Sequence, residues 1–471
     1  MRWLKDSWKR RPFPQLRVRD CLGRAKQRSV CCRHWSNGAA EMSRYPDLPV
    51  VLVHGTHRTA RLEAALEWCL TAALGLQWAF EPDVQRFQES TAPWKLQYGG
   101  AAVVDCWMQP EGLLEGKEIR RDPPQWGASA DWLALIFWMG SRMEEFHDSA
   151  PRDAHGRFDP RPSVPFAEGW LQRPVCEEWA FRLGAALLGA DWPQHESRLK
   201  DEYAVQPTLD VDSAFAFKGK GAWRTGAALG RDLVQGHWTR ARHRVQACRG
   251  RVQDPYDTYA QAAAWHKEYG MVPRWFFLMA RFGPHDKGLP PSSKMLAELM
   301  RSLDDTHPGS VQWHPGYAAA ADPRRLSEEY AAFTAALGRP PVASRQHYLR
   351  LVPGETRRQL LRLGIEEDHT EGHATCTGFR GGFSRSRRWY DLEREEMTSL
   401  KLCPFVAMDA TLCRYMEMQP NEVPTHLAGL AQSVRAVGGT MGLLWHNESL
   451  ATQAEWAAWG QVYPNVLQAV R

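Results

Sequence analysis

From about residue 208 onward, short apolar runs alternate with longer stretches of helical periodicity. The apolar runs predict strands at residues 208–212, 274–280, 311–314, 365–368, 402–409 and 440–446, and a shorter strand that reaches residue 347. A helical stretch at 222–248, which we expect to be broken, lies between the first two strands. Such strand–helix alternation predicts a parallel β/α architecture, either a barrel or an open sheet.

The first part of the chain has its own strand–helix opening. The apolar run at 49–53 predicts a strand, and residues 61–74 have helical spacing. We therefore expect a smaller amino-terminal α/β domain over residues 42–200 and a β/α domain over residues 201–471. Residues 1–41 are basic and broken by prolines, which indicates a disordered arm or a start site upstream of the true one at Met42.

Polar residues recur where the predicted strands end. Asp210 and Asp212 are two positions apart, so they point to the same side of an extended strand. The same position at later strands holds His314, His347, Asp368, Asp409 and His446. In parallel β/α folds the carboxyl ends of the strands form the edge that carries the active site. The sequence therefore predicts that these side chains gather in one place.

The residue types in this set suit a divalent metal ion. Asp212, His314 and His347 supply one carboxylate and two imidazoles and leave coordination positions open for water and substrate. This donor set is typical of Zn²⁺ and also accepts Co²⁺, Ni²⁺, Mn²⁺ or Fe²⁺. The alternative is that the histidines are structural: His314 precedes a Pro–Gly turn, and His347 can be a hydrogen-bonded core residue.

The remaining polar residues suggest acid–base roles. Asp210 is expected to be the general base and His446 the general acid. Arg380 is expected to hold Asp210 ionised and oriented, and Asp409 to do the same for His446. The alternative for Asp409 is a helix cap, and Arg380 lies in a glycine-rich turn.

Composition narrows the class of protein. The chain has 471 residues, 22 tryptophans and a formal net charge of only +5, without the strong basic field typical of nucleic-acid binding. The aromatic content suits carbohydrate binding, although most tryptophans belong in a core. No apolar run approaches the roughly 18–20 residues of a membrane span. The ten cysteines form no regular framework, which favours reduced thiols and a cytoplasmic location.

Several of these segments together resemble a known family. They are Thr-Leu-Asp-Val-Asp at 208–212, His-Pro-Gly-Tyr at 314–317, Ser-Arg-Gln-His-Tyr at 344–348, Gly-Phe-Arg-Gly-Gly at 378–382 and Leu-Leu-Trp-His-Asn at 443–447. They are similar to the bacterial polysaccharide deacetylase-like family, relatives of the NodB-type carbohydrate esterases. The resemblance runs from about residue 48 to the end. It implies a distorted β/α barrel preceded by a domain of unknown function.

The resemblance also implies residue roles. Asp210 matches the base, Asp212 the metal carboxylate and His314 a metal histidine, and Arg380, Asp409 and His446 match later motifs. The chain departs from the family pattern where Asp-Val-Asp replaces adjacent aspartates and Ala318 replaces a second histidine. His347 is proposed as the substitute ligand from the residues alone.

The expected function is a metal-dependent hydrolase that removes an N-acetyl, or alternatively O-acetyl, group from a bacterial polysaccharide or glycoconjugate. Two alternatives stay open: a carbohydrate-binding barrel without catalysis, and a glycosyltransferase whose Asp-x-Asp motif holds Mn²⁺ on a nucleotide sugar. The native metal, the substrate and the oligomeric state are not determined by the sequence.

Overall fold

The computed structural model describes residues 44–127, 130–452 and 456–471. Its elements up to residue 200 are β1 Val51–Gly55, α1 Ala60–Leu66, the π-helix η1 Glu67–Ala73, β2 Trp78–Phe80, α2 Val84–Glu89, β3 Lys95–Tyr98, β4 Trp107–Met108, α3 Trp132–Ser141, α4 Met143–Phe146, α5 Val164–Ala167, α6 Val175–Leu188 and α7 Trp192–Lys200. The expected basic segment at 1–41 lies outside the described residues.

Strands and helices alternate through the rest of the chain. They are β5 Ala204–Val211, α8 Ala222–Val234, α9 Trp238–Cys248, α10 Tyr259–Tyr269, β6 Arg274–Leu278, α11 Lys294–Thr306, β7 Val311–His314, α12 Pro323–Leu337, β8 Ala343–Ser344, α13 Glu355–Arg362, β9 Glu367–Asp368, β10 Arg387–Asp391, β11 Glu396–Leu402, β12 Ala407–Met408, α14 Val423–Ala436, β13 Thr440–His446 and α15 Val462–Val470. Short helical turns follow β8 and β13, at η5 His347–Leu349 and η7 Asn447–Leu450.

Two sheets organise the described chain. The first has the order β2-β1-β3-β4 with parallel pairing throughout. The second has nine strands in the order β10-β11-β9-β8-β7-β6-β5-β13-β12. Its strands pair in parallel except for the antiparallel hairpin of β10 and β11. The molecule is thus mixed α/β with parallel sheets.

The second sheet is open. Its order ends at β10 on one side and β12 on the other, and within the described residues no pairing joins these two strands. The distorted barrel implied by the family resemblance is thus supported as a parallel α/β arrangement, but strand pairing within the described residues does not close it. The expected division of the chain near residue 200 stays a prediction, although the first sheet uses strands before that point and the second uses strands after it.

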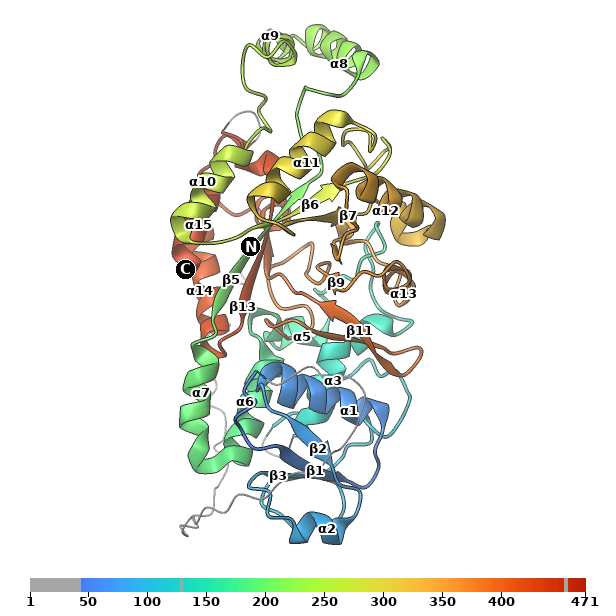
Figure 1. Cartoon of the computed structure of the whole chain (residues 1–471), viewed down its shortest axis with the longest axis vertical. Coiled ribbons are helices and arrows are strands. Elements are labelled where there is room, and N and C mark those ends of the chain that lie inside the picture. Colours follow the sequence, from blue (N-terminus) through green and yellow to red (C-terminus); the bar gives the residue numbers. More distant parts are fainter. Residues whose placement is uncertain (1–43, 128–129, 453–455) are drawn as a thin grey trace.

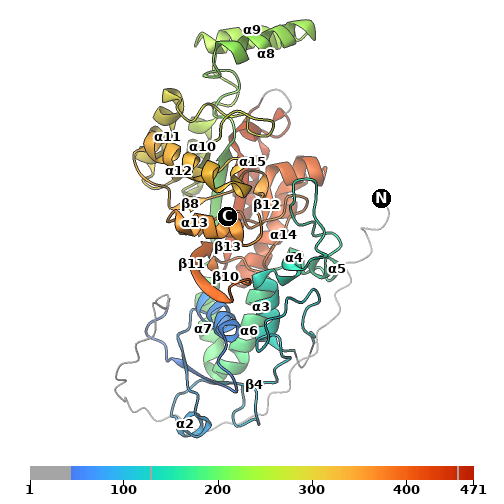
Figure 2. The same cartoon turned by 90° about the vertical axis from the view of Figure 1, so that its right-hand side faces the viewer.

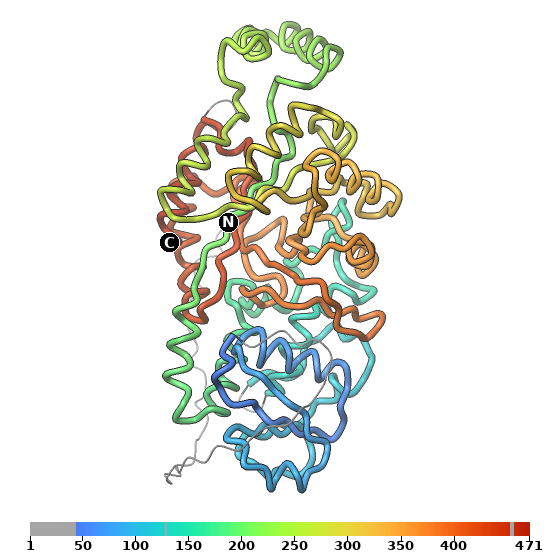
Figure 3. Tube along the Cα trace, viewed as in Figure 1, coloured from blue at the N-terminus to red at the C-terminus, as the bar shows by residue number. Residues whose placement is uncertain are grey.

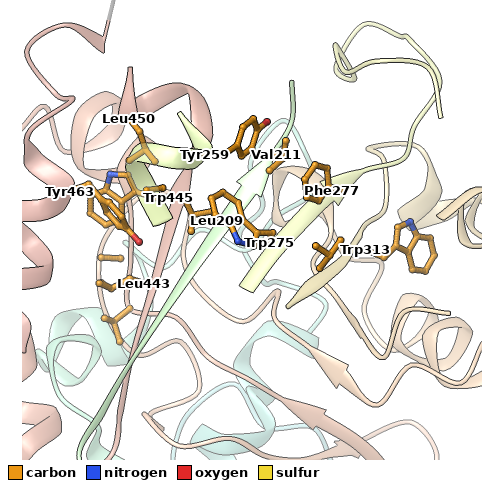
Figure 4. Close-up of a cluster of buried hydrophobic side chains, with 14 of the residues drawn as sticks. Leu209, Val211, Tyr259, Trp275, Phe277, Trp313, Leu443, Trp445, Leu450 and Tyr463 are labelled. Carbon is orange, nitrogen blue, oxygen red and sulfur yellow. The ribbon is translucent and has the colours of Figure 1, made fainter. Parts of the chain in front are cut away.

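The larger core packs around the second sheet (Figure 4). Leu209 on β5, Trp275 on β6 and Trp445 on β13 are almost fully buried beneath flanking helices. Because neighbouring strands place such large side chains on one face, the polar residues at the strand ends are carried on a rigid support. Burial of this apolar surface is the main force that holds the sheet together.

The first part of the chain, up to residue 200, packs on the β10–β11 hairpin. Figure 2 shows the hairpin directly above α3, and the two are in contact. Arg61 of α1, 1% exposed, pairs with Glu395 at the hairpin turn, with Nη2 2.6 Å from Oε1. Buried Glu177 of α6 accepts hydrogen bonds from the backbone N–H groups of Ser384 and Arg385. These contacts fix the first part of the chain against one edge of the second sheet.

One pair of helices lies apart from both sheets. Helices α8 and α9 extend from the body at one end of the long axis (Figures 1 and 3). They are inserted between β5 and α10, where the sequence predicted one broken helical stretch. The break falls at Gly236, whose φ of 73° lies in the left-handed region that favours glycine.

Candidate metal centre

The carboxyl end of β5 carries both aspartates predicted to be functional. Asp210 is the last residue of β5 that pairs with β13, opposite His446, and it is 2% exposed. Asp212 follows immediately after the strand ends at Val211. β5 lies between β13 and β6 in the sheet. Side chains that leave β5 therefore meet those that leave its neighbours.

Asp212, His314 and His347 converge at this edge. His314 ends β7 and His347 begins the turn η5 after β8. The Nε2 atom of His314 lies 3.2 Å from Asp212 Oδ1, and the Nε2 atom of His347 lies 3.2 Å from Asp212 Oδ2. One ligand atom from each of the three residues lies within 4.8 Å of the others. Ligand atoms around a tetrahedral zinc ion lie about 3.3 Å apart, so the spacing suits a metal.

Two of the ligand atoms have no hydrogen-bond partner. Asp212 Oδ1 and His314 Nε2 are buried, and among the described residues neither forms a hydrogen bond despite their separation of 3.2 Å. An unpaired buried acceptor costs free energy, typically about 1–3 kcal/mol. A cation between these atoms removes that cost. The chemistry and orientation of these donors therefore fit a divalent ion.

Hydrogen bonds on the far side of each ring fix the metal-facing nitrogen. The Nδ1–H of His314 donates to the backbone carbonyl of Arg345, and the Nδ1–H of His347 donates to Asp286 Oδ1 at 2.8 Å. Each Nε2 is thereby left facing Asp212. Such outer hydrogen bonds are typical of histidines that bind metals, because they select the tautomer and the ring orientation.

The charges at the cluster favour a cation. Burial lowers the pKa of His347, but Asp212 and Asp286 outweigh burial and raise this pKa to about 10. Burial raises the pKa of Asp212, but His347, His314 and His446 outweigh it and hold the pKa well below its usual range. The position between these residues therefore stabilises positive charge.

Asp210 has a different partner from the one expected. Its Oδ1 accepts a hydrogen bond from Arg345 Nη1 at 2.8 Å, and its Oδ2 lies 3.8 Å from His314 Nε2. Arg345 is fully buried, and its guanidinium lies over the ring of Phe276. Arg345 is thus the residue that orients Asp210.

The predicted pairing of Arg380 with Asp210 is wrong. Arg380 binds Glu145 instead, with Nε 2.9 Å from Oε1 and Nη2 2.7 Å from Oε2. The reason is that its glycine-rich turn packs on the first part of the chain, where Gly378 lies against the backbone of Leu171. Arg380 therefore links the two parts of the chain rather than reaching Asp210.

His446 and Asp409 form the expected contact. The Nδ1–H of His446 donates to Asp409 Oδ1 at 2.7 Å, and the His446 backbone N–H donates to Asp409 Oδ2 at 2.8 Å. Ser449 also donates to Asp409. The Nε2 atom of His446 lies 3.8 Å from Asp212 Oδ2. Burial lowers the pKa of His446, but Asp409 and Asp212 raise it to about 10.

Partly exposed aromatic rings stand next to the cluster. Tyr348 follows His347, with ring centroids 4.8 Å apart, and the rings of His285 and Tyr317 stack at 3.9 Å. His155, from the first part of the chain, contacts Tyr348 with centroids 5.0 Å apart. Tyr348 has a φ of 60°, which is strained for a residue other than glycine and recurs at functional sites.

In a second group of potential metal ligands, an arginine already contacts the ligand atoms. Glu367, His369 and Cys403 have ligand atoms within 4.8 Å of one another. Nη1 of Arg274 contacts Glu367 and lies 3.2 Å from His369 Nε2. Burial lowers the pKa of His369 to about 4. Because a guanidinium already neutralises Glu367, this group does not fit a metal ion.

Reasoning from the sequence missed Asp286 and Arg345. Asp286 follows β6, the one central strand whose end contributed no residue to the prediction. Arg345 lies two positions before His347 in a segment that was already selected for its histidine. Asp286 could therefore have been predicted from its place after a central strand, and Arg345 from its closeness in sequence to His347. Asp368, predicted to belong to the same edge, pairs instead with Arg357 at 2.8 Å.

Comparisons with known proteins cover parts of the chain. A family model described as "Family of unknown function (DUF7033)" matches residues 51–192. No curated protein matches the sequence. A solved structure described as "putative polysaccharide deacetylase from Mycobacterium smegmatis" is similar at 14% identity and a TM-score of 0.36, over 57% of this chain and 84% of that one. Among the described residues, no helix has the length and apolar character needed to cross a bilayer.

Proposed function

We propose that the protein is a metal-dependent deacylase that removes an acetyl group from an N-acetylated sugar of a bacterial polysaccharide or glycoconjugate. The observation that supports it most is the convergence of Asp212, His314 and His347, with two buried ligand atoms that have no hydrogen-bond partner among the described residues. Zn²⁺ suits these ligands best, and Co²⁺, Ni²⁺, Mn²⁺ or Fe²⁺ are alternatives.

The metal would supply Lewis-acid activation of water and of the acetyl carbonyl. Asp210 then accepts a proton at Oδ2 from the attacking water, while Arg345 holds Oδ1 through its hydrogen bond and orients the carboxylate. His446 donates its Nε2 proton to the leaving nitrogen, and Asp409 keeps Nδ1 protonated on the other side of the ring. A C–O bond forms, the amide C–N bond breaks, and the products are acetate and a free amine.

Two features support a sugar as the substrate. The rings of Tyr348, Tyr317 and His285 offer partly exposed aromatic surface beside the cluster, and the apolar faces of sugars stack on such rings. Asp286, but none of the three potential ligands, also lines a neighbouring pocket of about 840 Å³, within the usual range of ligand sites. Polar side chains such as Arg301, Arg325 and Glu329 line this pocket as well, which suits hydroxyl groups.

The proposal is tested by metal content and acetate release. Asp212→Ala, His314→Ala and His347→Ala are expected to lose bound metal, measured by mass spectrometry, and to release no acetate from chitooligosaccharides or peptidoglycan fragments. Asp210→Asn is expected to keep the metal and to lose roughly 10²–10⁴-fold in turnover, because the proton acceptor is gone. Gln206→Ala, at the opposite end of the described strand β5, is the matched control.

Each alternative outcome is informative. Unchanged metal content in all three alanine variants would contradict the metal centre. Loss of metal in Asp210→Asn, with retention in Asp212→Ala, would mean that the two aspartates exchange roles. Stoichiometric metal with sugar binding but no acetate release would contradict catalysis and favour a carbohydrate-binding protein.

A further inference from the structure

The projecting pair of helices α8 and α9 is firmly attached on its inner side. Asp232 of α8 is 3% exposed and pairs with Arg244 of α9, with Oδ2 2.8 Å from Nη2. Arg244 also lies over the ring of Phe217. Arg224 lies over the ring of Phe282 and donates to the backbone carbonyls of Lys287 and Gly288. The pair therefore has a defined inner face and a defined outer face.

The outer face of α8 is apolar. Positions 223, 226, 227, 230, 233 and 234 follow helical spacing along one side, hold Trp, Gly, Ala, Gly, Leu and Val, and are all exposed. Trp223 is 84% exposed and Val234 is 90% exposed. Trp238, at the start of α9, is 67% exposed. An amphipathic helix normally turns this face toward a core; here, within the described residues, the face is turned toward solvent.

The same element is strongly basic. Residues 222–249 hold six arginines and one aspartate, a formal charge of +5 that equals the net charge of the entire chain. Arg231, Arg240, Arg242 and Arg249 are exposed. Figures 1 and 2 place the helices across one end of the molecule, so this pair of helices is the first element to meet a flat surface that approaches along the long axis from that end.

We propose that the α8–α9 hairpin binds the surface of a bilayer that contains anionic lipids. Tryptophans and small apolar residues enter the boundary between headgroups and acyl chains, and the flanking arginines bind the phosphates. Nucleic acid is disfavoured as the partner because it offers no apolar phase for Val234 and Leu233. The hairpin thereby holds the body of the protein close to substrates carried on a membrane. This binding does not depend on the proposed deacylase activity.

The test uses the full chain and sedimentation with lipid vesicles. Wild type is expected to bind vesicles of phosphatidylcholine with phosphatidylglycerol and to leave pure phosphatidylcholine vesicles unbound. Added salt is expected to weaken the binding. Trp223→Ala with Trp238→Ala should weaken it at least about tenfold, and Arg231→Gln or Arg242→Gln about fivefold each, from the contribution of one basic residue near an anionic surface.

Matched controls come from elsewhere on the surface. Trp126→Ala removes a tryptophan that is 46% exposed, and Arg161→Gln removes an arginine whose side chain is 66% exposed; both should bind as wild type does. Because all the altered hairpin side chains are exposed, the variants should keep the wild-type unfolding midpoint. Equal binding to both vesicle types, or equal binding by the hairpin variants, would overturn the proposal. Self-association lost in the tryptophan variants, without vesicle binding, would overturn it in favour of a second copy.

Discussion

At the scale of single residues, the candidate site depends on groups that orient the potential metal ligands and the predicted base. Asp286 fixes His347 through Nδ1, and the carbonyl of Arg345 does the same for His314. Arg345 also binds Asp210 through its guanidinium. The segment 344–348 therefore orients His314, carries His347, and holds the predicted base Asp210.

Asp286→Asn is expected to weaken metal binding. The amide retains a hydrogen-bond acceptor for His347 Nδ1–H but loses the negative charge that makes the ring a stronger ligand. The affinity for Zn²⁺ should fall roughly 10–100-fold, as measured by isothermal titration against a competing chelator. Glu328→Gln, whose side chain lines the same pocket and is 62% exposed, is the control and should bind as wild type does. Equal affinities in the two variants would contradict this role of Asp286.

Sequence reasoning reached the potential ligands but not the residues that orient them. Asp210, Asp212, His314 and His446 stand at the ends of buried strands, and strand ends are visible as apolar runs. The partner of Asp210 is not visible in this way, because both Arg345 and Arg380 lie in loops. The choice between Arg345 and Arg380 depends on tertiary packing. Arg380 forms an ion pair with Glu145, which lies 235 positions away in the sequence.

At the scale of elements, the β10–β11 hairpin joins the two parts of the chain. Glu395 lies in its turn with a φ of 53° and binds both the guanidinium of Arg61 and the hydroxyl of Tyr390. Arg61 also donates to the backbone carbonyls of Leu113 and Glu118. A single carboxylate thus neutralises the buried cation of α1.

Glu395→Ala is expected to destabilise the protein by about 3–5 kcal/mol, because it leaves the charge of Arg61 buried without a counter-ion. The free energy of unfolding from urea denaturation measures this. The neighbour Glu396 is 55% exposed at its side chain and faces Arg394 at 3.7 Å, so Glu396→Ala should change stability by no more than about 0.5 kcal/mol. Equal effects in the two variants would show that the buried pair is not what joins these elements.

The sequence predicted some elements well and missed others. β7 and β13 appear where apolar runs predicted them, at Val311–His314 and Thr440–His446. β10 and β11 were missed, because the strand Arg387–Asp391 is rich in charged residues. Arg387 is nevertheless 2% exposed, since it pairs with buried Glu371 and donates to the carbonyl of Gly140. A charged strand buried by another part of the chain leaves no apolar pattern to detect.

At the scale of the whole molecule, neutral buried histidines couple stability to pH. Burial lowers the pKa of His266 to about 4, and its Nε2 lies 2.7 Å from the hydroxyl of Tyr463. Burial, followed by Arg380 and Arg142, lowers the pKa of His373 to about 3. Both residues are buried within the fold and ionise in the unfolded chain near pH 6.5.

The contribution of each of these histidines to the free energy of unfolding is therefore expected to fall as the pH drops from 6.5 toward 4. Above pH 6.5 each histidine is neutral in both states and contributes nothing. Below pH 6.5, each histidine is protonated in the unfolded chain but stays neutral in the folded chain. This difference lowers the free energy of unfolding by about 1.4 kcal/mol per pH unit and per histidine. For His266 the total is roughly 3 kcal/mol.

His266→Gln isolates this contribution. Its slope of unfolding free energy against pH, from urea denaturation between pH 6.5 and 4.5, should be shallower than that of wild type by about 1.4 kcal/mol per pH unit. His57→Gln, which alters a histidine whose side chain is 70% exposed, should leave the slope unchanged within that range. Parallel slopes for wild type and His266→Gln would contradict the assignment.

The three potential ligands come from separate crossovers, and Asp212 and His347 are 135 positions apart along the chain. During synthesis the first carboxylate leaves the ribosome long before the last imidazole exists, and domains form from the amino end as the chain emerges. The three side chains can surround one ion only after β5, β7 and β8 have come together in the sheet. Metal uptake would then act as a late checkpoint, and a chain released prematurely would carry every aspartate of the centre yet hold no ion.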